Sequence, residues 1–349
     1  MTKAASQRTL AGIQFGRAVA AILVVLYHGG RMLPQYLGDI GLARYFEYGN
    51  AGVDFFFVLS GFIIFHVHGK DIGRPAQLKN YLLRRFTRIY PIYWVVTALA
   101  IAMLVAKADW AALAPSHVVK SLILYPDDYD PIVGVAWTLC HEMTFYLVFA
   151  ALIASRRIGT LLILAWLALV LAGIFHPHQQ SNIKFLESPY HIEFALGALA
   201  AYCARKYPVT AAPGLVMIGL LAFLVVGFQF NGMAIKVPVA GRLLYGAASA
   251  LIIFGLAVWE SSGKISFPRW ASFLGAASYS IYLIHTFLLG WIGKVLARVF
   301  HQNSAPSLLY LVAVMGAVAA GCLLYQFVER RLLTVARGLR GPQPATAAP

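Results

Sequence analysis

The chain has 349 residues, of which 60% are hydrophobic and 12% are charged, and its formal net charge is +15. A soluble globular protein carries about twice this fraction of charged residues, so the composition excludes a water-soluble protein and indicates a chain solvated largely by the bilayer. A basic chain can also bind nucleic acid, but these cations are sparse and lie between apolar stretches, so we predict no nucleic-acid partner.

About ten apolar stretches approach the roughly 20 residues that a helix needs to cross a bilayer. They predict an all-α, polytopic transmembrane helix bundle, and no soluble domain fits between them. The Pro- and Ala-rich tail 341–349 is expected to be disordered, which leaves residues 1–340 as one transmembrane domain. The stretches are 10–31, 50–68, 88–106, 136–154, 158–174, 190–204, 213–229, 242–259, 274–298 and 307–328.

The loops on one side of these stretches hold roughly twice as many Lys and Arg residues as the loops on the other side. By the positive-inside rule this asymmetry places both termini in the cytoplasm, and we predict a multi-pass protein of a bacterial inner membrane. The three cysteines all fall inside apolar stretches and lack disulfide or metal spacing, so we predict packing roles for them and no metal site. They are Cys140, Cys203 and Cys322.

Ionisable groups at bilayer depth cost several kcal/mol and usually mark a functional site. Arg17 and His28 are such groups in the first stretch, and their spacing places both on one helix face, about 16 Å apart along the axis. One face would thus carry a cation toward the cytoplasm and a proton acceptor toward the outside. The alternative is that Arg17 extends to the interface and His28 is interfacial. The full set is Arg17, His28, Asp54, His141, Glu142, Glu193 and His285.

Asp54 lies near the outer end of the second stretch, at about the depth of His28. A carboxylate beside an imidazole fixes its tautomer and stabilises the imidazolium, which suits a general base. Alternatively, Asp54 only complements the helix dipole. Glu142 lies in the outer third of the fourth stretch, with Tyr146 one turn deeper on the same face, and both are candidates for the active centre. The alternative for Glu142 is a structural polar network between helices.

Arg85 and Arg88 lie where the third stretch begins, at the cytoplasmic surface. Their spacing places them on one helix face, and guanidinium groups bind phosphate oxygens in a bidentate manner. Ordinary positive-inside anchoring would also explain them. His285 lies in the middle of the ninth stretch, where it is either a catalyst or a hydrogen-bonded core residue, and a role in lining the site is intermediate between the two.

Together these motifs resemble membrane-bound acyltransferase family 3, and the resemblance extends from the first stretch to the tenth. The family often has Ser-x-Glu-Glu where this chain has Cys140-His141-Glu142-Met143, which leaves one carboxylate in place of two. The motifs are Arg17-x10-His28, Asp54 in a Phe-rich run that ends at Ser60-Gly61, Arg85-x-x-Arg88, the Trp137 to Tyr146 segment, and the run from Ser278 to His285.

The resemblance implies ten core helices with both termini in the cytoplasm. It implies transfer of an acyl group, usually acetyl from acetyl-CoA, to a hydroxyl of an extracytoplasmic polysaccharide or lipid-linked sugar. By this resemblance His28 would be the catalytic histidine and Asp54 would assist it, while Arg85 and Arg88 would hold the CoA phosphates. The donor path or active centre would be shaped by Arg17, Glu142 and Tyr146.

Two other readings are compatible with ten helices and buried charges. A proton-coupled sugar or lipid-linked saccharide transporter is the main alternative, although no inverted repeat is visible in the sequence. The second alternative is a non-catalytic scaffold for polysaccharide export. This reading does not explain why Arg17, His28 and Asp54 are kept in the membrane despite the free-energy cost of burying ionisable groups there.

Overall fold

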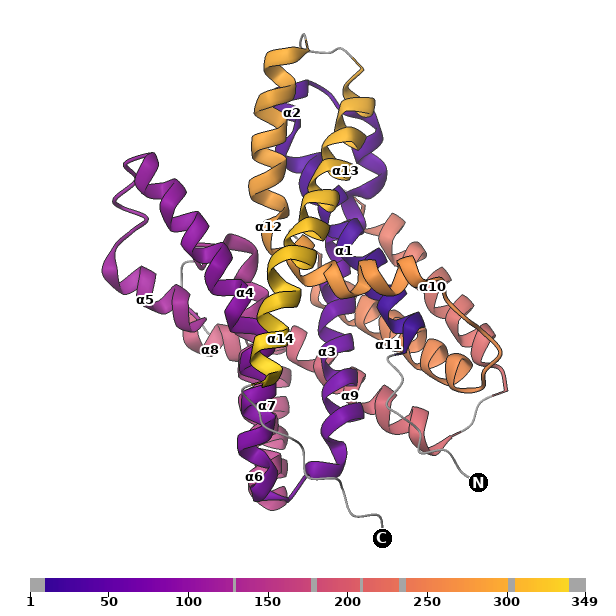
Figure 1. The fold of residues 1–349 in the computed structure, drawn as a ribbon. Coiled ribbons are helices and arrows are strands. Elements are labelled where there is room, and N and C mark those ends of the chain that lie inside the picture. Colours follow the sequence, from indigo (N-terminus) through magenta and orange to yellow (C-terminus); the bar gives the residue numbers. More distant parts are fainter. Residues whose placement is uncertain are drawn as a thin grey trace. The chain divides into compact units, whose positions relative to one another are not determined.

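The computed structural model describes residues 10–127, 130–176, 181–207, 210–231, 237–300 and 305–338. The regular elements within these ranges are all helices, joined by turns and loops, and the ranges contain no strand (Figure 1). The predicted disordered tail 341–349 lies outside the described residues.

Within these ranges, 9 helices are long and apolar enough to cross a membrane, so the prediction of an all-α polytopic bundle is confirmed. The sixth predicted stretch forms α9 (Tyr190–Lys206), a helix of 17 residues that is not among the nine. The nine contain α1 (Ala11–Met32), α3 (Gly52–His68), α4 (Leu78–Ala106), α6 (Trp137–Ala154), α7 (Arg156–Phe175), α10 (Ala212–Gln229), α11 (Val239–Ser261), α12 (Arg269–Val299) and α13 (Pro306–Leu324).

Helix α4 begins earlier than the predicted stretch 88–106, because its first part is amphipathic and a search for continuous apolar residues misses it. Arg85 and Arg88 therefore lie inside the helix and not at its start. A similar extension follows α13, where a π-helical segment (Tyr325–Glu329) leads into α14 (Arg330–Gly338).

The chain divides into two compact units. Unit 1 comprises Met1–Lys70 and Ile163–Cys322, and unit 2 comprises Asp71–Leu162 and Leu323–Pro349.

In unit 1, α1 packs against α12, α3 against α9, and α10 against α11, while α11 also contacts α3 and α9. The approach of α3 to α9 depends on two glycines. A Cβ on Gly197 would overlap the carbonyl oxygen of Val58, and one on Gly61 would overlap that of Phe194. Side chains of any size would force the two helices apart.

The start of α1 is held by a residue distant in the sequence. The carboxylate of Glu260, in the last turn of α11, accepts hydrogen bonds from the backbone N–H groups of Ala11 at 2.6 Å and Gly12 at 2.7 Å. A carboxylate at a helix N-terminus satisfies unpaired N–H groups and complements the helix dipole. This contact ties the beginning of α1 to the end of α11.

In unit 2, α4 packs against α6 and α14. The Tyr81 hydroxyl of α4 donates to the backbone oxygen of Tyr146 in α6 at 3.0 Å. The Tyr93 hydroxyl donates to the backbone oxygen of Ser121 at 2.6 Å, which attaches the short helix α5 (Pro115–Ile123) to α4. Unit 2 is therefore organised around α4, the helix that carries Arg85 and Arg88.

Candidate active site

His28 lies near the C-terminal end of α1, half-buried in unit 1. Its Nδ1 atom lies 3.0 Å from the backbone oxygen of Val24 and 3.2 Å from Nε2 of His285. A carbonyl oxygen can only accept, so Nδ1 carries the proton in this contact, and Nε2 of the neutral ring keeps its lone pair. His28 is thus held in the tautomer that a base acting through Nε2 requires.

His285, on α12, is fully buried and completes this arrangement. Its own Nδ1 atom lies 2.6 Å from the backbone oxygen of Tyr282, so it too carries the proton on Nδ1 and presents Nε2 as an acceptor to His28. The two rings meet edge to face, with centroids 4.9 Å apart. The packing of α1 on α12 therefore brings two histidines that are distant in the sequence into direct contact.

Asp54 lies in the first turn of α3, as predicted, but the imidazole of His28 contacts His285, and the hydrogen bond to Asp54 comes from Arg242. Nη1 of Arg242, in the first turn of α11, donates to Oδ2 of Asp54 at 2.8 Å. The carboxylate that was expected to orient His28 thus forms a buried ion pair within unit 1.

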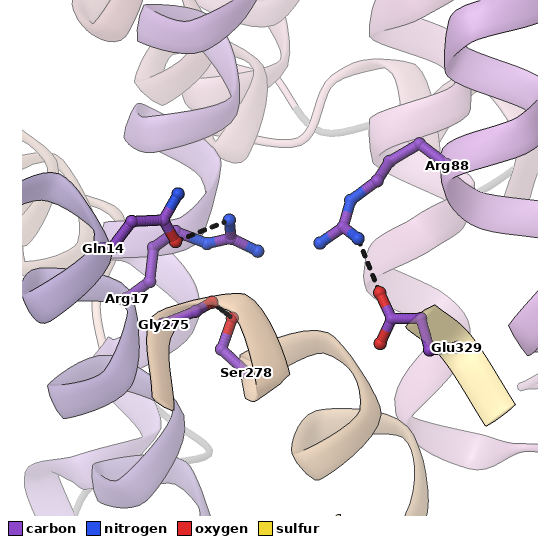
Figure 2. A network of polar contacts seen from close by, with 6 residues as sticks. All are labelled: Gln14, Arg17, Arg88, Gly275, Ser278 and Glu329. Carbon is purple, nitrogen blue, oxygen red and sulfur yellow. Dashed lines mark hydrogen bonds and ion pairs between the residues drawn. The ribbon is translucent and has the colours of Figure 1, made fainter. Parts of the chain in front are cut away.

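Arg17 lies on the same helix as His28, as the sequence indicated. Its Nη1 atom donates to the side-chain oxygen of Gln14 at 3.2 Å, and on the neighbouring α12 the hydroxyl of Ser278 donates to the backbone oxygen of Gly275 at 2.8 Å (Figure 2). The partner Gln14 lies one turn earlier on α1, so this bond holds the guanidinium of Arg17 to its own helix.

In unit 2, Arg85 lies against aromatic rings of two helices. Its guanidinium carbon is 6.0 Å from the ring centre of Tyr81 and 5.6 Å from that of Tyr146. The Tyr146 hydroxyl donates to Oε1 of Glu142, one turn earlier on α6, which holds the ring in place. The three predicted residues Arg85, Glu142 and Tyr146 therefore form one cluster between α4 and α6.

Arg88 forms an ion pair in which its Nη1 atom lies 2.5 Å from Oε1 of Glu329, a buried residue of the π-helical segment (Figure 2). Guanidinium groups have five N–H donors in a rigid plane, so a bond to one carboxylate fixes the orientation of the whole group. Segments of π-helix are frequent at functional sites.

Two partners found in the structure escaped the sequence analysis, because each belongs to a helix far from its partner in the chain. Arg242 opens the eighth predicted stretch, where it resembles an ordinary helix-end cation, and Glu329 lies just past the tenth predicted stretch. The position of this acidic residue, directly after the apolar stretch 307–328, was the available signal for Glu329. Across the described ranges, no group of three His, Cys, Asp or Glu residues is arranged to hold a metal ion.

A family model described as an acyltransferase domain matches residues 10–326. The chain belongs to acyltransferase family 3. This family 3 acyltransferase is 31% identical over 306 residues to the exopolysaccharide production protein ExoZ of Rhizobium meliloti, a match that covers 85% of this chain and 93% of that protein. It is also 26% identical over 381 residues to the acyltransferase MdmB of Streptomyces mycarofaciens, covering 97% of this chain and 95% of that one.

A protein of Staphylococcus aureus (strain COL) named as an O-acetyltransferase is 22% identical to this family 3 chain, over 94% of this chain and 58% of the relative. The chain thus spans little more than half of that relative. No solved structure matches it. The family membership and the apolar helices identify a multi-pass membrane acyltransferase, which confirms the resemblance seen in the sequence.

Proposed function

We propose that this acyltransferase transfers an acetyl group from cytoplasmic acetyl-CoA to a hydroxyl of an extracytoplasmic sugar, in a cell-surface polysaccharide or exopolysaccharide, at the bacterial inner membrane. The relative ExoZ is named for exopolysaccharide production, and another relative is named as an O-acetyltransferase. The observation that carries the proposal is the His28–His285 pair, which leaves Nε2 of His28 available as a base.

In this mechanism Nε2 of His28 removes the proton from the sugar hydroxyl. The hydroxyl oxygen forms a bond to the carbonyl carbon of the thioester, the carbon–sulfur bond breaks, and the proton passes from His28 to the departing thiolate. No net proton is gained or lost. A correctly placed general base contributes about 10²- to 10⁴-fold to the rate. His285 acts by holding the His28 ring in the required tautomer and orientation.

The CoA phosphates are assigned to Arg85 and Arg88 of unit 2. Tyr146, held by Glu142, supports the guanidinium of Arg85, and Glu329 orients that of Arg88. Supported arginines of this kind lose little freedom on binding phosphate. Arg17 is assigned to the donor path along α1. Asp54 is assigned to positioning helix α3, and in this way it shapes the active centre.

The direct test measures transfer of labelled acetyl from acetyl-CoA to oligosaccharides of the host's own exopolysaccharide, with purified protein in nanodiscs. His28→Ala should reduce the rate by at least about 10²-fold and leave acetyl-CoA binding unchanged, because only the base is removed. His176→Ala, at an exposed histidine, is the matched control and should transfer at the wild-type rate. Full activity of His28→Ala would exclude the mechanism, and a wild-type protein that binds no acetyl-CoA would exclude this donor.

A further inference from the structure

Three ionisable side chains in unit 1 meet at the N-terminal turns of three packed helices. They are Asp54 of α3, Glu193 of α9 and Arg242 of α11, and their exposed fractions are 0%, 0% and 8%. The carboxyl groups of Asp54 and Glu193 lie within hydrogen-bonding reach of each other. Gly246 makes room for this approach, since a Cβ there would lie 2.9 Å from Cγ of Glu193.

The hydrogen-bond donors around this cluster do not suffice for two ionised carboxylates. Arg242 donates to Oδ2 of Asp54, and its guanidinium carbon lies 5.5 Å from the ring centre of Tyr190. Among the described N–H and O–H donors, none bonds to Oδ1 of Asp54 or to either oxygen of Glu193. These oxygens also have essentially no accessible surface, so no water-sized space adjoins them.

Two adjacent carboxylates beside one guanidinium would leave an uncompensated negative charge in the interior, which costs several kcal/mol. Two carboxyl groups that share one proton avoid both the repulsion and the missing hydrogen bond. Tyr190 and Tyr245, which also lie near the cluster, are neutral hydroxyls and do not alter this charge balance. A proton shared between the two carboxyl groups needs no space beyond that which their oxygens already occupy.

We propose that this cluster is a proton-binding site in which Glu193 is a neutral carboxylic acid that donates to Asp54. The ion pair with Arg242 identifies Asp54 as the ionised partner, and the three groups then carry no net charge. The cluster acts as a neutral clamp that joins the N-terminal ends of α3, α9 and α11. Asp54 therefore serves the position of helix α3, and Glu193 has no part in the chemistry of transfer.

Infrared spectroscopy of the purified protein tests this inference without any substrate, so its outcome is independent of the proposed function. We expect the carbonyl band of a protonated carboxyl group to persist in the wild type up to about pH 9, far above the range in which exposed carboxyl groups titrate. The band should disappear in Glu193→Gln. Glu260→Gln is the matched control and should keep it, because the Glu260 oxygens accept from backbone N–H groups and need no proton.

The same variant gives a second readout. Glutamine is neutral and nearly isosteric with protonated glutamate, so Glu193→Gln should fold and should transfer acetyl within about twofold of the wild-type rate. The infrared experiment would overturn the inference if the wild type showed no such band at neutral pH, or if the band were unchanged in Glu193→Gln. The variant itself would overturn the inference if it failed to fold, or if it folded and lost transfer.

Discussion

At the scale of the residue, the position of each proton is set by the backbone oxygens beside the two histidines. Val24 and Tyr282 accept from the Nδ1 atoms of His28 and His285, which turns a pair of equivalent rings into a donor and an acceptor. The pair resembles a catalytic dyad in which a neutral imidazole takes the place that a carboxylate has in a serine protease. In the proposed mechanism this contact would orient His28 as the base without placing a second charge in the membrane.

Replacing His285 by Phe keeps a ring of similar size and removes the nitrogen that accepts from His28. We expect kcat to fall by about 10- to 100-fold, because the orientation of the base is lost, while KM for acetyl-CoA stays unchanged. Steady-state kinetics with a thermal unfolding control separates this result from misfolding. A parallel rise in KM with constant kcat would assign His285 to donor binding instead.

The arginines of α4 provide a second prediction at this scale. In the double variant Arg85→Ala, Arg88→Ala, acetyl-CoA should bind at least about 10-fold more weakly, or about 1.4 kcal/mol, because two phosphate-binding cations are removed. Arg84→Ala is the matched control from the same helix turn. This variant should bind acetyl-CoA normally, because Arg84 bonds to Asn80 and contacts neither the Tyr146 ring nor Glu329 in the proposed phosphate site. Isothermal titration in nanodiscs measures both, and unchanged affinity in the double variant would remove the phosphate role.

At the scale of the element, small residues decide which helices lie close enough for their buried ionisable side chains to contact each other. Gly61 and Gly197 allow the backbones of α3 and α9 to touch, and small residues serve the same purpose at helix interfaces in many membrane proteins. Glu193 lies one turn before Gly197, so the close approach also brings its carboxyl group to Asp54.

Gly197→Ala should therefore destabilise the protein by about 1–3 kcal/mol, because the added Cβ would overlap the backbone of α3. Gly214→Ala in α10 is the matched control, since a Cβ there meets no other atom within 4 Å and alanine is the better helix former. Thermal unfolding in one detergent compares the two. Equal melting temperatures would show that α3 and α9 can separate without cost.

At the scale of the whole molecule, topology follows from the distribution of Lys and Arg and remains a prediction. With both termini in the cytoplasm, the segment 107–135 between α4 and α6 faces outward and the loop that contains Lys264 faces inward. Because these loops flank long helices, their exposed residues report the orientation directly.

The test uses a background in which Cys140, Cys203 and Cys322 are replaced by Ala, with a single cysteine introduced at Ala111 or at Ser262, both exposed. On intact cells with a permeable outer envelope, a maleimide that cannot cross the inner membrane should label Ala111→Cys and not Ser262→Cys. Lysed cells provide the control, in which both should react. The reverse pattern would invert the orientation.

Much of this protein could be predicted from sequence alone, because the bilayer imposes a simple rule: an apolar stretch of sufficient length becomes a helix that satisfies its own backbone hydrogen bonds. The all-α class, most spans, the acyltransferase family and the placement of Arg17 and His28 on one helix follow from local pattern. The start of α4 did not, because an amphipathic helix lacks a continuous apolar run.

Only the tertiary structure decided which polar groups meet. His28 and His285 are 257 positions apart, and Asp54 and Arg242 are 188 apart, so their pairing depends on which helices pack together and in what register. Local periodicity gives the face of a helix on which a residue lies but not the helix that this face contacts. For that reason the sequence indicated His28 and Asp54 only as candidates, and the packing of α1 on α12 and of α3 on α11 assigned their partners.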